Sequence, residues 1–282
     1  MITCPKDVVV ADVSGRTWNG YYRRAGPTMP ANAWGDLSYA AGIPSSNYYA
    51  SSPMVSAALS AADGIDQGPA AALTKTLRRW TIIPPTACGI SDFRLQDSCI
   101  YYPFIDGDGG YQAMTQAAII TRYDGGHGCF VMAVSQGVGT AQADVTLTYT
   151  NSDGLDGRTV TATLNFAAAA GQLTSSCPAG SAYTGACGPY FPLMVGCRGV
   201  RSIQSAEVLT AAGGICALVI VRPIADLGMI EATTSVLETD FYDDMQQIPE
   251  IGPGAYLNLI MHTITAAAPA TVIGRCDFIW KE

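Results

Sequence analysis

The stretch "TLTYTNSDGLDGRTVTATLNF", residues 146–166, decides the fold class. Leu147 and Tyr149 alternate with threonines, and apolar residues from Val160 to Phe166 alternate with Thr and Asn. A period of two in β-branched and aromatic residues is typical of a strand with one buried face and one wet face. The Asn-, Asp- and Gly-rich segment between the runs tolerates positive φ and hydrogen-bonds its own backbone. The stretch therefore predicts an antiparallel hairpin with a loop longer than two residues.

Similar short runs follow one another from residue 75 to the C-terminus, separated mostly by Gly- or Pro-rich turns. No helical pattern lies between consecutive runs, as parallel βαβ units would require. The sequence thus predicts an all-β protein, an antiparallel β-sandwich or jelly-roll-like fold with at most one short helix. The predicted strands are Lys75–Ile83, Cys99–Ile105, Ala117–Tyr123, Cys129–Ser135, Val145–Thr150, Thr159–Phe166, Val200–Leu209, Ile215–Arg222, Tyr256–Thr263 and Thr271–Trp280.

Two segments depart from simple alternation. Ile215–Val221 is apolar throughout, which predicts a central strand buried on both faces. Near 234–246, Leu237, Phe241 and Met245 recur at four-residue spacing, which predicts the single helix.

The domain organisation follows from where strands are expected. Residues 1–72 form a loop-rich N-terminal arm, because residues 20–72 combine prolines and aromatics with no sustained period. Residues 73–282 form the β-sandwich domain, either as one unit or as two packed sub-sandwiches divided near 167–198. We expect residues 20–72 to dock on a neighbouring subunit, so that their removal leaves a soluble domain. The alternative is that they wrap their own sandwich and complete its core.

The composition restricts the classes of partner that the protein is expected to bind. The chain is 49% hydrophobic but only 13% charged, which suits a β protein with a neutral surface of small residues. Its net charge of −8 disfavours nucleic-acid binding, which needs basic residues to replace counterions along phosphates. No apolar stretch approaches the roughly 20 residues of a spanning helix, so no membrane partner is expected. The start, "MITCPKDVVV", has no signal-peptide pattern, so we expect synthesis and first folding in a cytoplasm.

Nine cysteines are present, none in CxxC spacing, and with two histidines a zinc site is not expected. Cys129, Cys216 and Cys276 lie in apolar runs, where a thiol is usually an inert hydrophobe. The candidates for a disulfide are Cys177, Cys187 and Cys197, in a Gly-, Pro- and Ser-rich loop, although a reducing cytoplasm favours free thiols.

A search for catalytic chemistry yields only weak candidates. We interpret His127, between glycines, as structural, and His262 as lying on the wet or interface face of its strand. Asp106 and Asp108 stand in a turn that resembles a calcium loop, but the twelfth position is Ala117 instead of Glu, so a plain turn is favoured. The acidic residues of the expected helix are interpreted as a solvated face; they are Glu238, Asp240, Asp243 and Asp244. We therefore predict no catalytic, cofactor-binding or metal-binding residue, no cofactor, and no enzymatic activity.

The stretches "GCRGVRSIQSAEVLTAAGGICALVIVRPIADL" (196–227) and "DFYDDMQQIPEIGPGAYLNLIM" (240–261) resemble a pattern in virion structural proteins of tailed bacteriophages. The hairpin loop "TYTNSDGLDGRT" and "YYPFIDGDGG" fit the same pattern, so the resemblance spans roughly residues 98–261. The chain departs from the pattern at Cys197 and at Gly252-Pro253-Gly254. The resemblance implies a β-rich accessory protein of the particle, on the head or the tail.

Pattern and resemblance together predict a capsid decoration or cement protein, located in the virion after assembly on the particle exterior. Its expected partners are the major capsid protein or other virion proteins, and it is expected to be a homo-oligomer. The first alternative is a tail, neck or baseplate structural protein. The second is a carbohydrate-binding or carbohydrate-active β-sandwich, in which exposed Trp and Tyr would stack on sugars.

Overall fold

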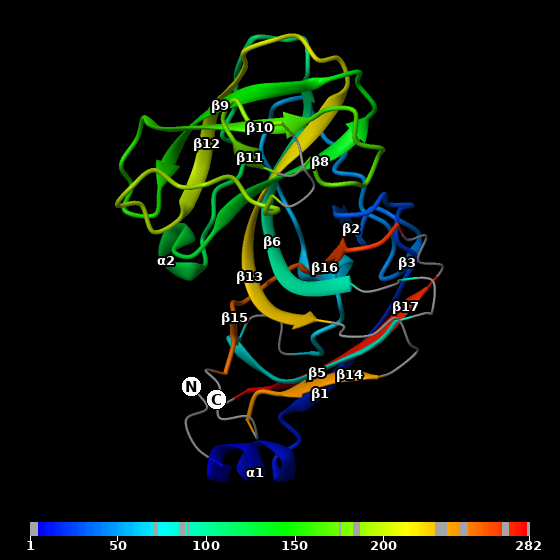
Figure 1. Ribbon diagram of the computed structural model, residues 1–282. Helices are drawn as coiled ribbons and strands as arrows, with labels where there is room; N and C mark the ends of the chain where they lie inside the picture. The colour runs from blue at the N-terminus through cyan, green and yellow to red at the C-terminus, as the bar shows by residue number, and fades with distance from the viewer. Residues whose placement is uncertain are drawn as a thin grey trace.

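The computed structural model describes residues 5–69, 73–84, 88, 91–174, 176–182, 187–228, 236–242, 248–266 and 271–280 (Figure 1). The protein is all-β, and every ladder between named strands is antiparallel, which confirms the predicted fold class. Among the described residues, no helix is long and apolar enough to cross a membrane. The elements are α1 (Pro5–Val13), β1 (Thr17–Arg24), β2 (Ala33–Asp36), β3 (Gly42–Ile43), β4 (Ala57–Ala58), the 3₁₀ turn η1 (Ala61–Asp63), β5 (Lys75–Ile83), β6 (Ser91–Asp106), β7 (Tyr111–Ala113), α2 (Tyr123–Gly126), β8 (Phe130–Gly137), β9 (Gln142–Asn151), β10 (Arg158–Asn165), β11 (Cys177–Pro178), β12 (Val200–Val208), β13 (Ile215–Gly228), β14 (Leu237–Asp240), β15 (Glu250–Ile251), β16 (Leu257–Thr263) and β17 (Val272–Ile279).

The strands form three sheets, named here by their place in Figure 1. The upper sheet has the order β11-β10-β9-β12-β7, and its β9–β10 pair is the hairpin predicted from residues 146–166. The central sheet has the order β2-β16-β6-β13-β8, with β4 beside β6. The lower sheet has the order β14-β5-β17-β1-β3, with β15 beside β5.

An upper and a lower apolar core share the long bent strands β6 and β13, and a third cluster with Tyr101 and Val219 fills the inside of the central sheet. In the upper core, Ile100, Tyr102 and Leu218 pack with the inner face of the upper sheet. In the lower core, Phe93 and Leu95, from the first half of β6, pack with the inner face of the lower sheet. The expected division near 167–198 is therefore wrong, because the boundary between the cores crosses the middle of two continuous strands.

Most predicted strands are present, but Ala117–Tyr123 is wrong. Its residues approach the left-handed turn α2, where Tyr123 and Asp124 have φ of 56° and 48°. The segment is held by side chains instead of a ladder, since the Ala118 amide donates to Ser56 Oγ at 2.7 Å. Strand β6 also begins eight residues before its predicted start, because charged residues at its beginning interrupt the apolar pattern.

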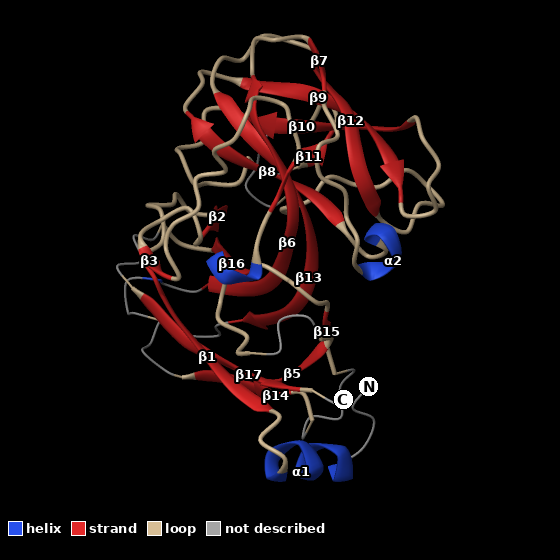
Figure 2. Ribbon diagram, turned by 180° about the vertical axis from the view of Figure 1, so that it is seen from behind, coloured by secondary structure: helices blue, strands red, loops and turns tan. Residues whose placement is uncertain are grey.

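The helix expected near 234–246 is also corrected. Leu237–Asp240 is strand β14, paired with β5, and residues 229–235 and 243–247 lie outside the described residues. The four-residue spacing misled because Leu237, on the strand, and Phe241, in the turn after it, both pack on the lower core. Among the described residues, the one regular helix is α1, below the lower sheet in Figure 2, where Val8 and Ala11 pack on Ile279.

The N-terminal segment is built into the fold instead of projecting from it. Strand β1 lies between β17 and β3, and β2 pairs with β16. Tyr22 and Leu37 are buried in the lower core. Within one chain the segment therefore completes its own sandwich, as the alternative expects, while docking of the same segment on a neighbouring subunit stays a prediction. Sequence periodicity missed this because the strands of this segment are short and joined by long loops.

Removal of residues 20–72 is consequently expected to produce aggregated protein. The deletion removes most of β1 and all of β2, β3 and β4. The lower and central sheets then lose edge strands, and their apolar faces become exposed to water. Expression trials followed by light scattering test this expectation. A truncated chain that is monomeric and melts cooperatively would contradict the arrangement described here.

Candidate functional site

A strap, residues 171–174 and 187–191, nearly closes the central sheet into a barrel. It lies between the two edge strands, because Gln172 bridges to Gly35 on β2 and Leu173 bridges to Val134 on β8. Farther along, Tyr190 bridges to Met132, also on β8. The strap therefore supplies backbone partners to both edges, which would otherwise be open to another strand.

The barrel interior combines apolar side chains with one buried polar network. Asp36, fully buried on β2, accepts hydrogen bonds from the Ser38 amide at 2.8 Å and the Asn258 amide group at 2.8 Å. The hydroxyl of Tyr49 also donates to this carboxylate. Burial and the nearby Asp36 carboxylate raise the pKa of Tyr49 well above its usual value. Because Asp36 is saturated with donors, the network is suited to fixing the strands rather than to binding a ligand.

The barrel mouth is closed by a stack of five planar side chains, here called the mouth stack. Its order is Phe130, Tyr190, Arg94, Trp34 and His262. The Phe130 and Tyr190 rings are 5.5 Å apart, and the Arg94 guanidinium lies 5.3 Å from the Tyr190 ring and 5.5 Å from the Trp34 ring. The Trp34 and His262 rings are 4.8 Å apart. These separations are those of aromatic and cation–π contacts.

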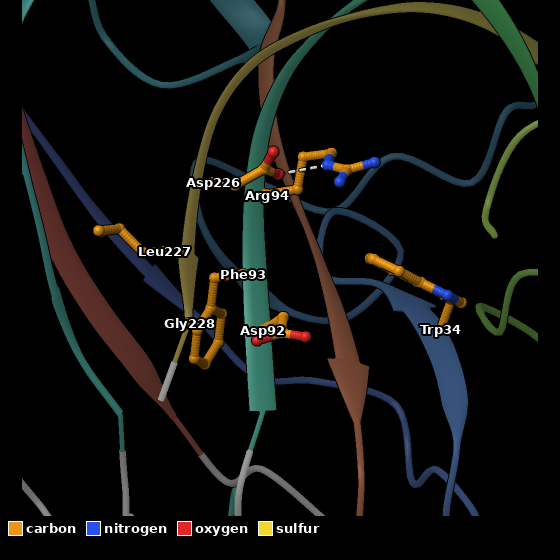
Figure 3. A pocket seen from close by; sticks show the side chains of 7 residues that line it. All are labelled: Trp34, Asp92, Phe93, Arg94, Asp226, Leu227 and Gly228. Carbon is orange, nitrogen blue, oxygen red and sulfur yellow. Dashed lines mark hydrogen bonds and ion pairs between the residues drawn. The ribbon is translucent and has the colours of Figure 1, made fainter. Parts of the chain in front are cut away.

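Register explains why these side chains meet. His262 on β16 is opposite both Asp92 on β6 and Trp34 on β2, so the three side chains share one face of the sheet. Arg94 is two residues along from Asp92, and Asp226 on β13 is opposite it. Figure 3 shows Arg94 and Asp226 reaching toward each other across the two strands, where Nε of Arg94 donates to the carboxylate.

Charge at the mouth is concentrated on Arg94 and two carboxylates. Burial works against the charge of Arg94, but Tyr190 and Asp226 outweigh it and raise the pKa of the guanidinium. Burial raises the pKa of Tyr190 to about 12, so this hydroxyl stays protonated at neutral pH. Nδ1 of His262 is 4.0 Å from the Asp92 carboxylate. The cation is therefore held between rings while the acids remain largely exposed.

A cavity of about 240 Å³ opens beside the mouth stack. It is lined by Trp34, Asp92, Phe93, Arg94, Asp226, Leu227 and Gly228 (Figure 3). Trp34 is only 9% exposed, and Arg94 and His262 already lie against its ring. A sugar would need a free aromatic face for stacking, which this ring does not offer. The mouth stack is thus suited to closing the barrel and holding the strap.

The strap is tied to the mouth stack by a hydrogen bond and a disulfide. Nε1 of Trp34 donates to the Cys187 carbonyl at 3.2 Å, and Cys187 is joined to Cys177. Of the three candidate cysteines, Cys177 and Cys187 therefore form the bridge and Cys197 is free. Cys129, Cys216 and Cys276 are buried, as expected, and burial raises the pKa of Cys216 to about 12.

Replacing Cys177 and Cys187 together by Ser is expected to lower stability by about 2–3 kcal/mol, because the bridge no longer restricts the unfolded chain. Thermal unfolding of oxidised protein measures this loss, and reductant should reproduce it in the wild type. Cys197→Ser is the matched control and should melt as the wild type does. Equal melting of all three proteins would mean that the bridge does not form in solution.

The other sequence candidates do not converge on a site. His127 is exposed in the α2 turn, where its carbonyl accepts from Arg222, in keeping with a structural role. His262, expected on the wet or interface face of its strand, is partly buried in the mouth stack and therefore does not lie on a wet face. Asp106 and Asp108 form a plain turn, since the amide of Asp108 donates to Asp106 at 2.9 Å. Among the described residues, no group of three potential metal ligands occurs.

The acidic group of the expected helix is likewise divided. Glu238 and Asp240 lie on β14 beside Arg79, while Asp243 and Asp244 lie outside the described residues.

Sequence reasoning missed the mouth stack because its members come from five separate segments. The alternation of Asp92, Arg94 and Gln96 with Phe93 and Leu95 could have predicted that this part of β6 is a strand with one polar and one apolar face.

Comparison with known proteins identifies no family. No family model and no curated protein matches the sequence. An overlay on a chain of the crystal structure of the infectious bursal disease virus VP2 subviral particle has a TM-score of 0.19 and 8% sequence identity. It covers 94% of this chain and 80% of that chain. At this TM-score the overlay carries no argument about fold or function.

Proposed function

We propose that this protein is a non-enzymatic structural component of a bacteriophage virion that decorates the head and stabilises the capsid lattice. In this role it binds the major capsid protein or a neighbouring virion protein by adding interface area. A tail, neck or baseplate position is the alternative.

The proposal rests on where the two stretches that resemble phage virion proteins, residues 196–227 and 240–261, lie in the fold. They include β12 and most of β13 and β16, so the resemblance involves the framework and not a peripheral loop. Gly199, within "GCRGVRS", is required by close approach, since a Cβ there would lie 2.1 Å from the carbonyl oxygen of Gly126. Val200 and Ile203, which follow it, are fully buried in the upper core. The shared residues therefore serve architecture, as a structural role requires.

The mouth stack adds a second, weaker support. Each member of the stack contacts the next, Tyr190 belongs to the strap, and Trp34 donates a hydrogen bond to it. The Asp36 network is saturated by its own chain. The polar groups of the mouth stack and of the Asp36 network thus hold the barrel closed, as expected of a structural protein.

The test is quantitative mass spectrometry of particles purified from the phage that encodes this chain, with heads and tails separated. Hundreds of copies in the head fraction would support decoration of the lattice. About a dozen copies or fewer, or recovery with tails, would establish the alternative position. Absence from purified particles would refute a virion role, and hydrolysis or binding of glycans by the purified protein would favour the carbohydrate alternative.

A further inference from the structure

The two edges of strand β1 are paired to different extents. Along one edge β1 pairs with β17 over its whole length, from Thr17 to Arg24. Along the other edge, β3 pairs only with Arg23 and Arg24. Residues 17–22, here called the open edge, therefore form a border of the lower sheet (Figure 2).

Hydrogen bonds at the two ends of β1 show which of its backbone groups point away from the sheet. The Trp280 amide donates to the Arg16 carbonyl at 3.2 Å, so the even-numbered residues of β1 bond to β17. On the other side, the Ala25 amide donates to the Ala41 carbonyl at 3.0 Å, so the odd-numbered residues bond to β3. Where β3 ends, the backbone groups of the odd-numbered residues consequently point outward.

Three residues of the open edge thus present backbone groups to a further strand. The N–H and C=O groups of Thr17, Asn19 and Tyr21 point outward, and none has a hydrogen-bond partner within the described ranges. Such unpaired donors and acceptors are a template for pairing with another strand. Helix α1 leaves them accessible, because it contacts Ile279 on β17 and Arg78 on β5, on the other side of β1.

Other borders of the described sheets have features that hinder such pairing. The central sheet is closed by the strap, and the upper sheet ends in β7, of three residues, and in β11, which contains Pro178. The part of β10 beyond β11 begins with Arg158, and β14 carries Glu238 and Asp240. Short strands, proline and charge are the usual protection of an edge. The open edge, "TWNGYY", has neither charge nor proline, which is typical of an edge that is paired.

We propose that the open edge pairs with the open edge of a second copy, antiparallel and around a twofold axis through Asn19. In this register Asn19 is opposite its own equivalent, and Thr17 of each copy is opposite Tyr21 of the other. Because the backbone groups of all three residues point outward, each opposed pair exchanges two hydrogen bonds. The lower sheets of the two copies then form one continuous sheet. This dimer would suit a virion component or any other role, so its test is separate from that of the proposed function.

Strand β3 and the length of the open edge determine the register. Arg23 already bonds to Ile43 of β3, so it cannot pair with a second copy. A shift of two residues toward β3 would place Thr17 of the second copy opposite Arg23, and the opposite shift would lose a pair. The register centred on Asn19 therefore uses all three outward residues. Before Thr17 the chain turns at Gly15, whose φ is 66°, and leaves the line of the strand.

The side chains of the open edge favour a second copy as the occupant. Trp18 is 38% exposed, and the pairing places it opposite Gly20 of the second copy, in both copies alike. Gly20 lies against Ile65 and Asp66, so the indole ring would pack beside this segment of the second copy, where glycine leaves it space. The paired residues are uncharged, so two chains of net charge −8 meet at a neutral border. Self-pairing thus buries the large apolar side chain that one copy leaves at its edge.

Sedimentation velocity over a concentration series to about 500 μM tests the proposal on the full-length protein. A contact of one strand pair is at the small end of specific interfaces, so we expect a weak dimer, with a dissociation constant of about 100 μM. A wild type that stays monomeric over this series would overturn the proposal.

Substitutions of Asn19 locate the contact. Asn19→Pro removes the outward N–H at the axis without removing a bond to β17, and it should raise the dissociation constant by about 10-fold or more. Asn19→Lys keeps the N–H but sets two like charges opposite each other on the axis, so it should also weaken the dimer. Asn19→Thr is the matched control and should dimerise as the wild type does. A dimer that persists in the Pro and Lys variants, or that the Thr variant weakens equally, would contradict pairing at this edge.

Hydrogen exchange of the wild type, followed by NMR for individual amides, requires no variant. In dilute protein the amides of Asn19 and Tyr21 should exchange rapidly, while those of Trp18 and Gly20 are protected by β17. At about 500 μM, exchange at Asn19 and Tyr21 should slow roughly threefold, in proportion to the fraction of dimer. Val138, 63% exposed in the loop after β8, should not change. Dimerisation without slower exchange at the odd-numbered residues would place the interface elsewhere and refute the proposal.

Discussion

Val219→Asp is expected to remove a large part of the free energy of unfolding of this protein. Val219 is fully buried at the centre of β13, opposite Tyr101 on β6 and Met132 on β8. Its side chain points into the barrel interior, while the adjacent Leu218 and Ile220 point into the upper core. A carboxyl group there has no partner, so the substitution should cost several kcal/mol, from a total stability of about 5–15 kcal/mol.

Urea unfolding monitored by circular dichroism measures this cost. Val138→Asp is the control for the change in charge, and it should alter the free energy of unfolding by about 0.5 kcal/mol or less because Val138 is exposed. A Val219→Asp variant with an unchanged midpoint would mean that β13 is not buried on both faces.

Asp97→Ala is expected to lower the free energy of unfolding by about 3–5 kcal/mol. Asp97 is fully buried on β6 and accepts hydrogen bonds from Arg122 at 2.5 and 2.6 Å. It also accepts from the Tyr123 hydroxyl at 2.8 Å and from the Tyr256 amide at 2.9 Å. The carboxylate therefore ties the left-handed α2 turn and the start of β16 to the strand that both cores share.

The cost arises mainly from the cation that is left behind. Burial disfavours the charge of Arg122, but Asp97 outweighs it and raises the pKa of the guanidinium. Because the Arg122 side chain is only 11% exposed, it cannot recover water when Asp97 is removed. Adding Arg122→Met should therefore restore a large part of the lost stability.

Asp226→Ala is the matched control, since Asp226 also pairs with an arginine but has a side chain that is 62% exposed. It should cost no more than about 1 kcal/mol. Equal losses in Asp97→Ala and Asp226→Ala, measured by chemical denaturation, would show that burial of the pair does not decide its contribution.

Much of the architecture follows from local pattern. The alternation around residues 146–166 predicts the β9–β10 hairpin, and the apolar run from Ile215 predicts a strand with both faces buried. These predictions succeed because side-chain direction in a strand depends only on position along the backbone, and burial then selects apolar residues. The absence of helical spacing between such runs also predicts antiparallel sheets.

The class of fold, the places of most strands and the burial of the thiols in them therefore follow from the amino-acid pattern. Which distant segments meet depends on tertiary contacts. The mouth stack joins Trp34, Arg94 and His262 through strand register, and Ile83 on β5 is opposite Ile273 on β17 in the same way. Local pattern also misassigned Leu237–Asp240, where pairing with β5 overrode a helical spacing. The physical reason is that periodicity reports which face of an element is buried, whereas the neighbour it is buried against depends on contacts between residues far apart in the chain.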